Sequence, residues 1–179
     1  LQTWHGGLGI WGGVAFGAVA GVWLLRRRGL RLGPFYDAAA PTILVAQAMG
    51  RFGNYFNQEL FGGPTTLPWG LEIDRAHLPA GYAPGTLFHP AFLYEALWNV
   101  AGALVLVWLG RHLMRRDGAM GGRLLWAYLM VYTVGRAWIE YLRVDEAAVV
   151  LGLRLNEWTA MIVFLVGLVG FVAAGRRGA

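Results

Sequence analysis

Residues 90–116 read PAFLYEALWNVAGALVLVWLGRHLMRR. The first part is mainly apolar, and a helix needs about 20 such residues to cross the hydrocarbon core of a bilayer. Arg111, Arg115 and Arg116 follow it directly, as is typical of a segment that reaches the membrane surface. This stretch therefore predicts a transmembrane helix at residues 90–109.

The same pattern recurs along the chain, with further apolar runs at residues 6–25, 35–56, 121–141 and 158–174. The second of these carries Pro41, which we place in its first turns, where a missing backbone N–H is tolerated. Hydrophobic residues make up 57% of the sequence and charged residues 14%, with a mean hydropathy of +0.48. That composition is typical of a protein in the lipid bilayer rather than of a water-soluble protein. We expect an all-α polytopic membrane protein, one domain over residues 1–179 with five transmembrane helices.

Residues 62–89 contain several prolines and only brief apolar patches, so they predict an extramembrane loop or small cap. Arginines gather in the connections on the opposite side of the predicted membrane. There lie Arg26, Arg27, Arg28, Arg31, Arg111, Arg115, Arg116, Arg176 and Arg177, with Arg123 close by. The side of the 62–89 loop carries only Arg75, Arg143 and Arg154, among acidic residues. The positive-inside rule then predicts a cytoplasmic C-terminus, an extracytoplasmic 62–89 loop and an extracytoplasmic first residue.

The chain starts at Leu1, without Met, on a segment that enters the membrane, so we expect further sequence before it. Its first predicted span carries Gly13, Gly17 and Gly21 at four-residue spacing. Small residues in such a row predict close packing against another helix.

The sequence contains no Cys, Ser or Lys. These absences exclude disulfides, thiolate metal sites, Cys or Ser nucleophiles and Lys Schiff bases. An enzyme of this composition is expected to transfer its group directly, and we expect neither a metal nor a cofactor. The net charge of +5 comes from arginine clusters at span ends, which indicate topology rather than nucleic-acid binding.

Ionisable residues inside spans are costly, and each is a candidate for function. Tyr132, Arg136, Glu140 and Arg143 follow one another at spacings of four, four and three residues. Such spacings place all four on one face of the fourth predicted helix. An ion pair that only holds two helices together is the alternative interpretation.

The second predicted span ends in the block GRFGNYFNQE, residues 50–59, where polar side chains suddenly follow an apolar run. Arg51 and Asn54 are neighbours on one helical face, and Gly50 and Gly53 leave space for a ligand. A guanidinium group binds phosphate through its bidentate fork. The alternative, an ordinary polar helix end, does not explain an arginine on the arginine-poor side.

His5 opens the first predicted span and Glu95 the third, both from the side of Arg51. Histidine accepts a proton near neutral pH, although a solvated anchor at the interface would look the same. We expect the candidate residues to meet in the outer half of the bundle, and His77 and His112 to lie on the surface.

Four motifs, in this order, resemble the bacterial prolipoprotein diacylglyceryl transferase family. They are HGGLG at 5–9, GRFGNYFNQELFG at 50–62, HPAFLYE at 89–95 and YTVGRAWIEYLR at 132–143. The resemblance runs from His5 to about Thr159, and the 50–62 block is its most specific part. Family members carry two further spans ahead of the HGGLG motif, which implies seven spans in the complete protein. Asn156 and Glu157 stand where the family often has a Gly-Gln pair.

The resemblance implies a reaction in the bacterial inner membrane. The family transfers the diacylglyceryl group of phosphatidylglycerol to the lipobox cysteine of a prolipoprotein signal peptide, forms a thioether and releases glycerol phosphate. The implied partners are therefore phosphatidylglycerol, the precursor peptide and the lipid bilayer. The nucleophile is the substrate's thiol, which agrees with a chain that has no cysteine of its own.

By alignment of the motifs, the family's phosphate-binding arginine falls on Arg51, its signature asparagine on Asn54, its essential histidine on His5 and its second essential arginine on Arg136. Other important family positions fall on Glu59, Gly62, Tyr132 and Glu140. The expected catalytic residues are His5, Tyr132, Arg136 and Glu140. The expected residues that bind phosphatidylglycerol are Arg51, Asn54, Asn57, Glu59, Gly62, Glu95 and Arg143.

Two other functions fit a membrane protein with buried charges. A transporter or channel would use the arginines and glutamates as a pathway for anions or protons, but it needs polar residues through the whole depth of the bundle. A non-catalytic lipid-binding relative of the family would keep the fold and lose the reaction.

Overall fold

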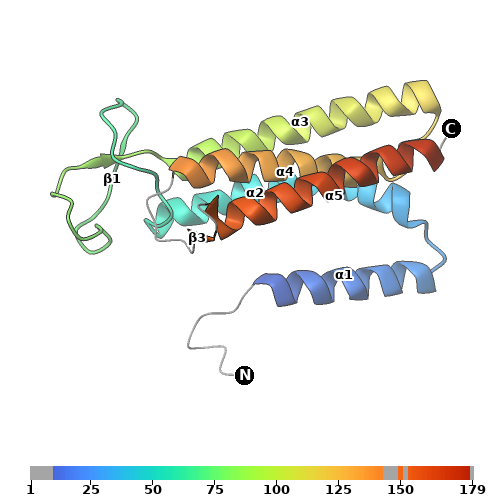
Figure 1. Cartoon of the computed structure of the whole chain (residues 1–179), viewed down its shortest axis with the longest axis horizontal. Helices are drawn as coiled ribbons and strands as arrows, with labels where there is room; N and C mark the ends of the chain where they lie inside the picture. The colour runs from blue at the N-terminus through green and yellow to red at the C-terminus, as the bar shows by residue number, and fades with distance from the viewer. Residues whose placement is uncertain (1–9, 143–148, 151–152, 178–179) are drawn as a thin grey trace.

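The computed structural model describes residues 10–142, 149–150 and 153–177. In this part of the chain there are five α-helices, coloured along the sequence in Figure 1. They are α1 (Ile10–Arg27), α2 (Leu32–Phe56), α3 (Ala91–Asp117), α4 (Arg123–Leu142) and α5 (Leu155–Arg177). Their positions agree with the five apolar runs, and the differences lie at the helix ends.

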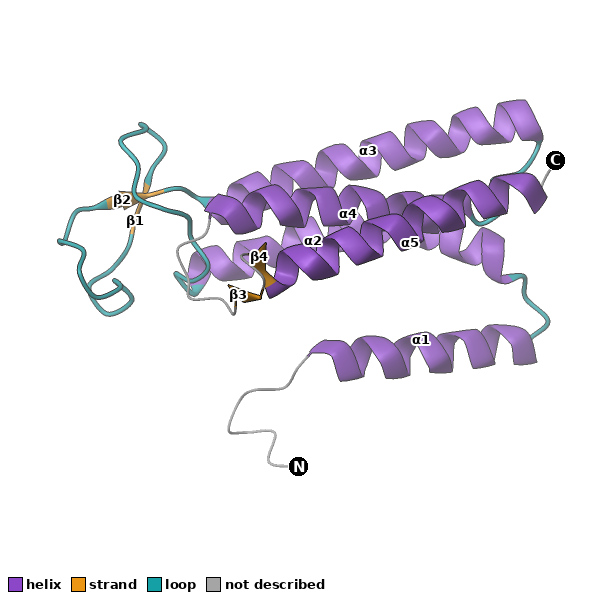
Figure 2. Cartoon of the chain, viewed as in Figure 1, coloured by secondary structure: helices purple, strands orange, loops and turns teal. Residues whose placement is uncertain are grey.

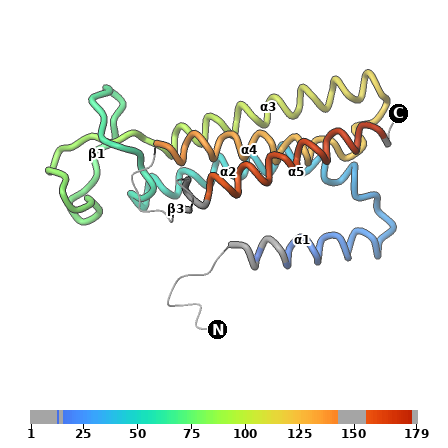
Figure 3. The backbone as a smooth tube through the Cα atoms, in the orientation of Figure 1, coloured from blue at the N-terminus to red at the C-terminus, as the bar shows by residue number. Residues whose placement is uncertain are grey.

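Helices α2 to α5 form an up-and-down bundle, and the tube in Figure 3 shows α1 set apart from it. Phe16 and Val19 on α1 are mostly exposed. If a Cβ were added to Gly13, Gly17 or Gly21, no neighbouring atom would lie within 4 Å of it. The predicted close packing of these glycines is therefore wrong for this structure, because no helix among the described residues lies against them.

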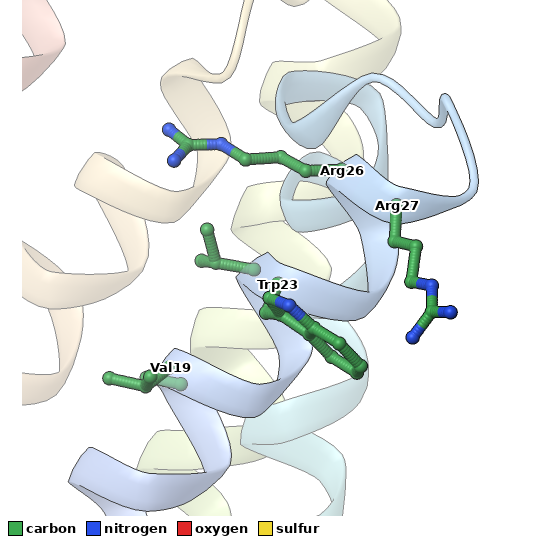
Figure 4. A pocket seen from close by; sticks show the side chains of 6 residues that line it. Val19, Trp23, Arg26 and Arg27 are labelled. Carbon is green, nitrogen blue, oxygen red and sulfur yellow. The ribbon is translucent and has the colours of Figure 1, made fainter.

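The last two turns of α1 line a surface cavity of about 660 Å³, shown in Figure 4. The guanidinium carbon of Arg27 lies 5.1 Å from the ring centre of Trp23, a cation–π distance. Arg26 extends in a different direction from Arg27 (Figure 4). Tryptophan followed by arginine is the composition of a helix end at a membrane surface.

The core of the bundle is built from alanine and leucine, including Leu44 of α2 and Leu106 of α3, both fully buried. Small residues bring the helices together. A Cβ on Gly102 of α3 would lie 2.6 Å from Val131 of α4, and one on Gly170 of α5 would overlap Trp126. Close approach through glycine is the usual way in which helices pack where lipid supplies no hydrophobic drive.

Two helix ends differ from the sequence prediction. Helix α2 begins at Leu32, which places Pro41 in its interior rather than in its first turns. Helix α3 continues to Asp117, well past the predicted end at residue 109, and stops at Gly118. Gly118 has a φ of 69°, the left-handed conformation in which helices commonly end at glycine.

Two helical segments of the described chain are long and apolar enough to cross a membrane, Ala91–Asp117 and Asn156–Arg176. By the same measure α1, α2 and α4 do not qualify. Helix α1 is 18 residues long and ends in Arg26 and Arg27, which lower its mean hydropathy, whereas α2 and α4 carry charged side chains such as Asp37 and Arg136. Five transmembrane helices therefore stay a prediction.

Residues 57–90 form a small cap at one end of the bundle, coloured as loop with two short strands in Figure 2. Strand β1 (Leu71–Glu72) pairs antiparallel with β2 (Leu87–Phe88). The Phe88 side chain is fully buried between the rings of Phe61 and Tyr82. A second pair, β3 (Val149–Val150) and β4 (Leu153–Arg154), precedes α5. These strands are the exceptions to the all-α expectation. We refer to the two ends of the bundle as the cap end and the far end.

Candidate active site at the cap end

A row of alternating charges crosses the bundle below the cap, and four helices contribute to it. Arg51 of α2 places its Nε 2.5 Å from a carboxylate oxygen of Glu95 on α3. The other Glu95 oxygen lies 3.7 Å from Arg136 of α4. Arg136 also pairs with Glu140 at 2.9 Å, and Asn156 of α5 donates to Glu140 at 3.1 Å. We call Arg51, Glu95, Arg136, Glu140 and Asn156 the cap-end cluster.

The charges of this cluster are buried to different degrees. The Glu95 and Glu140 side chains are 6% and 2% exposed, whereas those of Arg51 and Arg136 are 21% and 20% exposed. Removing one partner of a buried ion pair leaves an uncompensated charge, which is strongly unfavourable. The carboxylates therefore hold the guanidinium groups in place, while the arginines keep an accessible side toward which an anion can bind.

Glu95 occupies the central position because it contacts arginines of two different helices. Two guanidinium groups close together repel each other, and a carboxylate between them offsets that repulsion. Its two oxygens meet the two arginines much as two oxygens of a phosphate could. The arrangement thus brings together two positive groups that the sequence separates widely.

A small cavity of about 10 Å³ lies beside the cluster, lined by Glu95, Arg136, Tyr132 and buried Asn99 among others. This volume is that of a single water-sized sphere. The hydroxyl of Tyr132 and the amide of Asn99 make no hydrogen bond within the described residues. Polar groups without protein partners therefore point to a place where a ligand or water completes the bonding.

Hydrogen-bonding side chains continue from the cap-end cluster toward the middle of the bundle. Gln47, one turn before Arg51 on α2, donates to the hydroxyl of Tyr128 at 3.0 Å. The Tyr128 ring stacks on Tyr132, with centroids 5.9 Å apart. The side-chain oxygen of Gln47 is buried without a partner. The cluster is thus backed by further hydrogen-bonding groups rather than by an apolar wall alone.

The expected residues at the end of α2 divide into two groups. Asn54 is half-buried, three residues beyond Arg51 on the same side of the helix, and its amide makes no hydrogen bond within the described chain. Asn57 and Glu59 are exposed, and the Asn57 amide donates to Glu59 at 3.1 Å. The structure therefore brings Asn54 to Arg51 but does not bring Asn57 or Glu59 into the cluster.

Gly62 has a structural role at the junction of the cap with the bundle. Its N–H donates to the carbonyl of His89 at 2.9 Å, and the N–H of Gly63 donates to Leu142 at the end of α4. A Cβ on Gly62 would lie 2.8 Å from the His89 Cβ. Only glycine fits here without displacing the start of α3. Gly62 therefore allows the cap to pack closely against the end of the bundle that carries the cap-end cluster.

Two expected site residues, His5 and Arg143, lie outside the described residues. His77 and His112 are exposed, as the sequence predicts. Three residues near the cluster were missed as site residues: Gln47, Asn99 and Asn156. Spacing could have indicated two of them, because Gln47 and Asn99 each stand four residues from a charged member of the cluster.

A second polar cluster, also missed, joins the helices at the far end. The buried carboxylate of Asp37 on α2 accepts the N–H groups of Gly122 and Leu124, at 2.7 and 2.8 Å, and so caps the start of α4. Arg123 pairs with Asp117 at 2.8 Å and lies 3.4 Å from the carbonyl of Gly175 near the end of α5. A carboxylate at a helix start and a guanidinium at a helix end both stabilise the helix dipoles.

Sequence comparison identifies the family. The family model for prolipoprotein diacylglyceryl transferase matches residues 1–173. The chain belongs to this family. The resemblance carried by the four motifs is thereby confirmed, and the cap-end cluster contains arginines from two of those motifs.

Curated relatives in the family are about half identical to this chain. The chain is 53% identical to the phosphatidylglycerol–prolipoprotein diacylglyceryl transferase 2 of Streptomyces coelicolor, over 99% of the chain and 55% of the relative. The transferase of Cutibacterium acnes is 51% identical over 97% of the chain and 57% of its own length. That of Bifidobacterium adolescentis is 48% identical, over 99% and 55%. The chain thus spans about half the length of these relatives.

Proposed function

We propose that this protein transfers the diacylglyceryl group of phosphatidylglycerol to the cysteine thiol of a prolipoprotein lipobox. The sulfur attacks the glyceryl carbon that bears the phosphate, a C–S bond forms, and the C–O bond to phosphate breaks. The electron pair leaves with glycerol phosphate, and the thiol loses its proton. The observation that carries the proposal is the meeting of Arg51 and Arg136 on one carboxylate in a chain of this family.

The two arginines have complementary roles in this proposal. Arg51, beside the unbonded amide of Asn54, holds the phosphate of the donor lipid through its planar fork. Arg136, oriented by Glu95 and Glu140, faces the negative charge that grows on the leaving oxygen as the C–O bond breaks. Groups that are fixed before the reaction stabilise such charge without reorganising, which is a large source of rate enhancement.

The thiol must ionise before it attacks. A free cysteine has a pKa of about 8.5, so a base or a cationic field promotes the thiolate near neutral pH. We assign the base to His5 and the field to the two arginines. Tyr132 lies beside Arg136 in the wall of the small cavity, where its hydroxyl can donate to the phosphate or to the glyceryl oxygens.

The proposal includes a membrane orientation. All five helices cross the bacterial inner membrane, with the cap and the cap-end cluster on the extracytoplasmic side and the far end in the cytoplasm. The arginines at residues 26–31, around the end of α1, and at residues 111–116, in the last turns of α3, support this orientation. It places the reaction at the leaflet into which a signal peptide's cleavage region emerges.

Transfer is tested with the protein as its gene encodes it, in vesicles containing phosphatidylglycerol and a lipobox peptide. A mass gain of one diacylglyceryl group on the peptide is expected, and Arg51→Ala should abolish it. Arg75→Ala, which removes an exposed arginine of the cap, is the matched control. No mass gain with the unchanged protein would favour transport or passive lipid binding instead.

A further inference from the structure

A second cavity, separate from the small one beside the cluster, lies between α4 and α5. It has a volume of about 370 Å³, within the range of ligand sites. Its walls are Thr133, Val134 and Ala137 of α4 and Ala160, Met161, Phe164 and Leu165 of α5. Val134, Met161 and Leu165 are about half exposed, so the cavity is a groove on the surface of the bundle. We call it the α4–α5 groove.

The lining of the groove offers its occupant no hydrogen bond. Thr133 is the single lining residue with a side-chain oxygen or nitrogen, and its hydroxyl already lies 2.7 Å from the Leu129 carbonyl of its own helix. Its methyl group and the other side chains are hydrocarbon or thioether. An apolar site without polar partners selects a hydrocarbon ligand.

The groove is too small to enclose a peptide helix. A helix with its side chains is about 10 Å wide, so even a 10 Å length fills roughly 800 Å³, about twice this volume. Ala137 and Ala160 are the small residues of the lining, and they lie where α4 and α5 run together. An unbranched acyl chain is much thinner than a helix and fits a groove of this volume, and Met161 can adapt its shape to the chain.

The groove leads directly to the cap-end cluster. Glu140 lies one turn beyond Ala137 on α4, and Asn156 lies one turn before Ala160 on α5. The hydrogen bond from Asn156 to Glu140 therefore crosses the end of the groove, at about 5 Å along the helices from its alanines. A chain in the groove has its polar end beside Glu140, which is paired with Arg136.

We propose that the α4–α5 groove binds one acyl chain of the diacylglycerol donor, with the ester end at the Glu140–Asn156 bond. This inference rests on the proposed function and adds where the donor's chain lies. The groove would then act as a guide that aligns the glyceryl carbon with the two arginines.

The test uses donors of different chain length. Ala137→Leu and Ala160→Leu narrow the groove from its two sides, and Ala173→Leu makes the same change at an exposed position of α5 outside it. We expect the two groove variants to lose at least about tenfold of transfer from dipalmitoyl-phosphatidylglycerol. Transfer from dihexanoyl-phosphatidylglycerol should stay within twofold, about the level of the Ala173→Leu control, because short chains end near the cluster. Ala137 is exposed, so its variant is expected to fold even if Ala160→Leu does not.

A binding measurement complements the activity. Phosphatidylglycerol with a photoreactive diazirine on one acyl chain should crosslink to Met161 or Phe164, and excess unlabelled phosphatidylglycerol should suppress the product. An unchanged chain-length profile in the Ala137→Leu variant would overturn the inference while leaving the proposed function intact. Equal crosslinking by labelled phosphatidylcholine would also overturn it, because the groove would then hold bilayer lipid in general. If the unchanged protein transfers nothing from any donor, the proposed function fails first.

Discussion

The bundle has a charged cluster at each end, and the two differ in the kind of partner that their side chains have. At the far end, Asp37 accepts the backbone N–H groups of Gly122 and Leu124 at the start of α4. Arg123 there pairs with the side chain of Asp117 and also lies against a backbone carbonyl of α5. At the cap end, Arg51 and Arg136 pair with side chains of Glu95 and Glu140. Backbone partners are fixed by the helices, whereas side-chain partners can be exchanged.

The arginines of the two clusters also differ in how far their side chains are exposed. The Arg123 side chain is 11% exposed, but those of the two cap-end arginines are about twice as accessible and have unbonded polar groups nearby. The far-end cluster therefore serves to join helix ends, and the cap-end cluster combines that role with binding. Buried charge in a membrane bundle is thus not by itself a sign of function. The two clusters are separated by the backbone partners of Asp37 and by the greater exposure of the cap-end arginines.

In the proposed orientation, the cap-end cluster and the far-end cluster lie on opposite sides of the membrane. Cysteines introduced at Ala83 in the cap and at Ala119 beyond α3 can be labelled with an impermeant maleimide, since the chain has no other cysteine. Ala119 is preferable to Gly118, whose left-handed φ disfavours a side chain. In intact cells only the Ala83 site should react. Labelling of both sites to the same extent would contradict the proposed orientation.

Arg51→Lys tests whether the cap-end arginine binds through its shape or only its charge. Lysine keeps the positive charge and loses the bidentate fork. We expect transfer to fall by about 10²-fold or more, nearly as far as in Arg51→Ala. Removing one preorganised hydrogen-bond donor from the group on which negative charge grows, here the leaving phosphate, typically slows a reaction to that extent. Steady-state transfer to a lipobox peptide measures it. A lysine variant with most of its activity would show that a point charge is sufficient.

Glu95→Gln tests whether the central carboxylate positions the two arginines. The amide has the same size but no charge, so one charge-assisted bond, worth about 1.5–3 kcal/mol, is lost. We expect kcat to fall by about tenfold or more while KM for phosphatidylglycerol does not rise. Glu72→Gln on the exposed strand β1 is the control. A raised KM with unchanged kcat would instead indicate that Glu95 contacts the lipid headgroup directly.

Asp37→Ala should affect stability and leave transfer per folded molecule unchanged. It leaves the N–H groups of Gly122 and Leu124, at the start of α4, without their acceptor, at a cost of about 1–3 kcal/mol. Thermal unfolding of the purified protein in detergent measures the loss, and the transfer assay is run well below the unfolding temperature. Glu72→Ala, on strand β1 of the cap, controls for loss of an exposed carboxylate. Selective loss of transfer in a stably folded Asp37→Ala variant would remove the distinction between the clusters.

Much of the candidate site was predictable because its charged residues interrupt apolar runs. Arg51, Arg136 and Glu140 stand out in helices where charge is costly. The amides were harder to find, since Asn99 and Gln47 differ little from ordinary helix residues until their surroundings are known. Asn57 and Glu59 lie on the surface outside the cap-end cluster, because the chain leaves the helix after Phe56, so their binding of phosphatidylglycerol stays a prediction.

The apolar helices, the arginine-rich ends and the face that each charged side chain occupies on its own helix all follow from the local order of residues. Helical periodicity is enough to predict them. The position of Glu95 between Arg51 and Arg136, and the capping of α4 by Asp37, could not be predicted in this way. Contacts between helices depend on how closely and in what register the helices pack. That packing is set by small residues such as Gly102 against Val131 and Gly135 against Trp98, whose partners are distant in the chain.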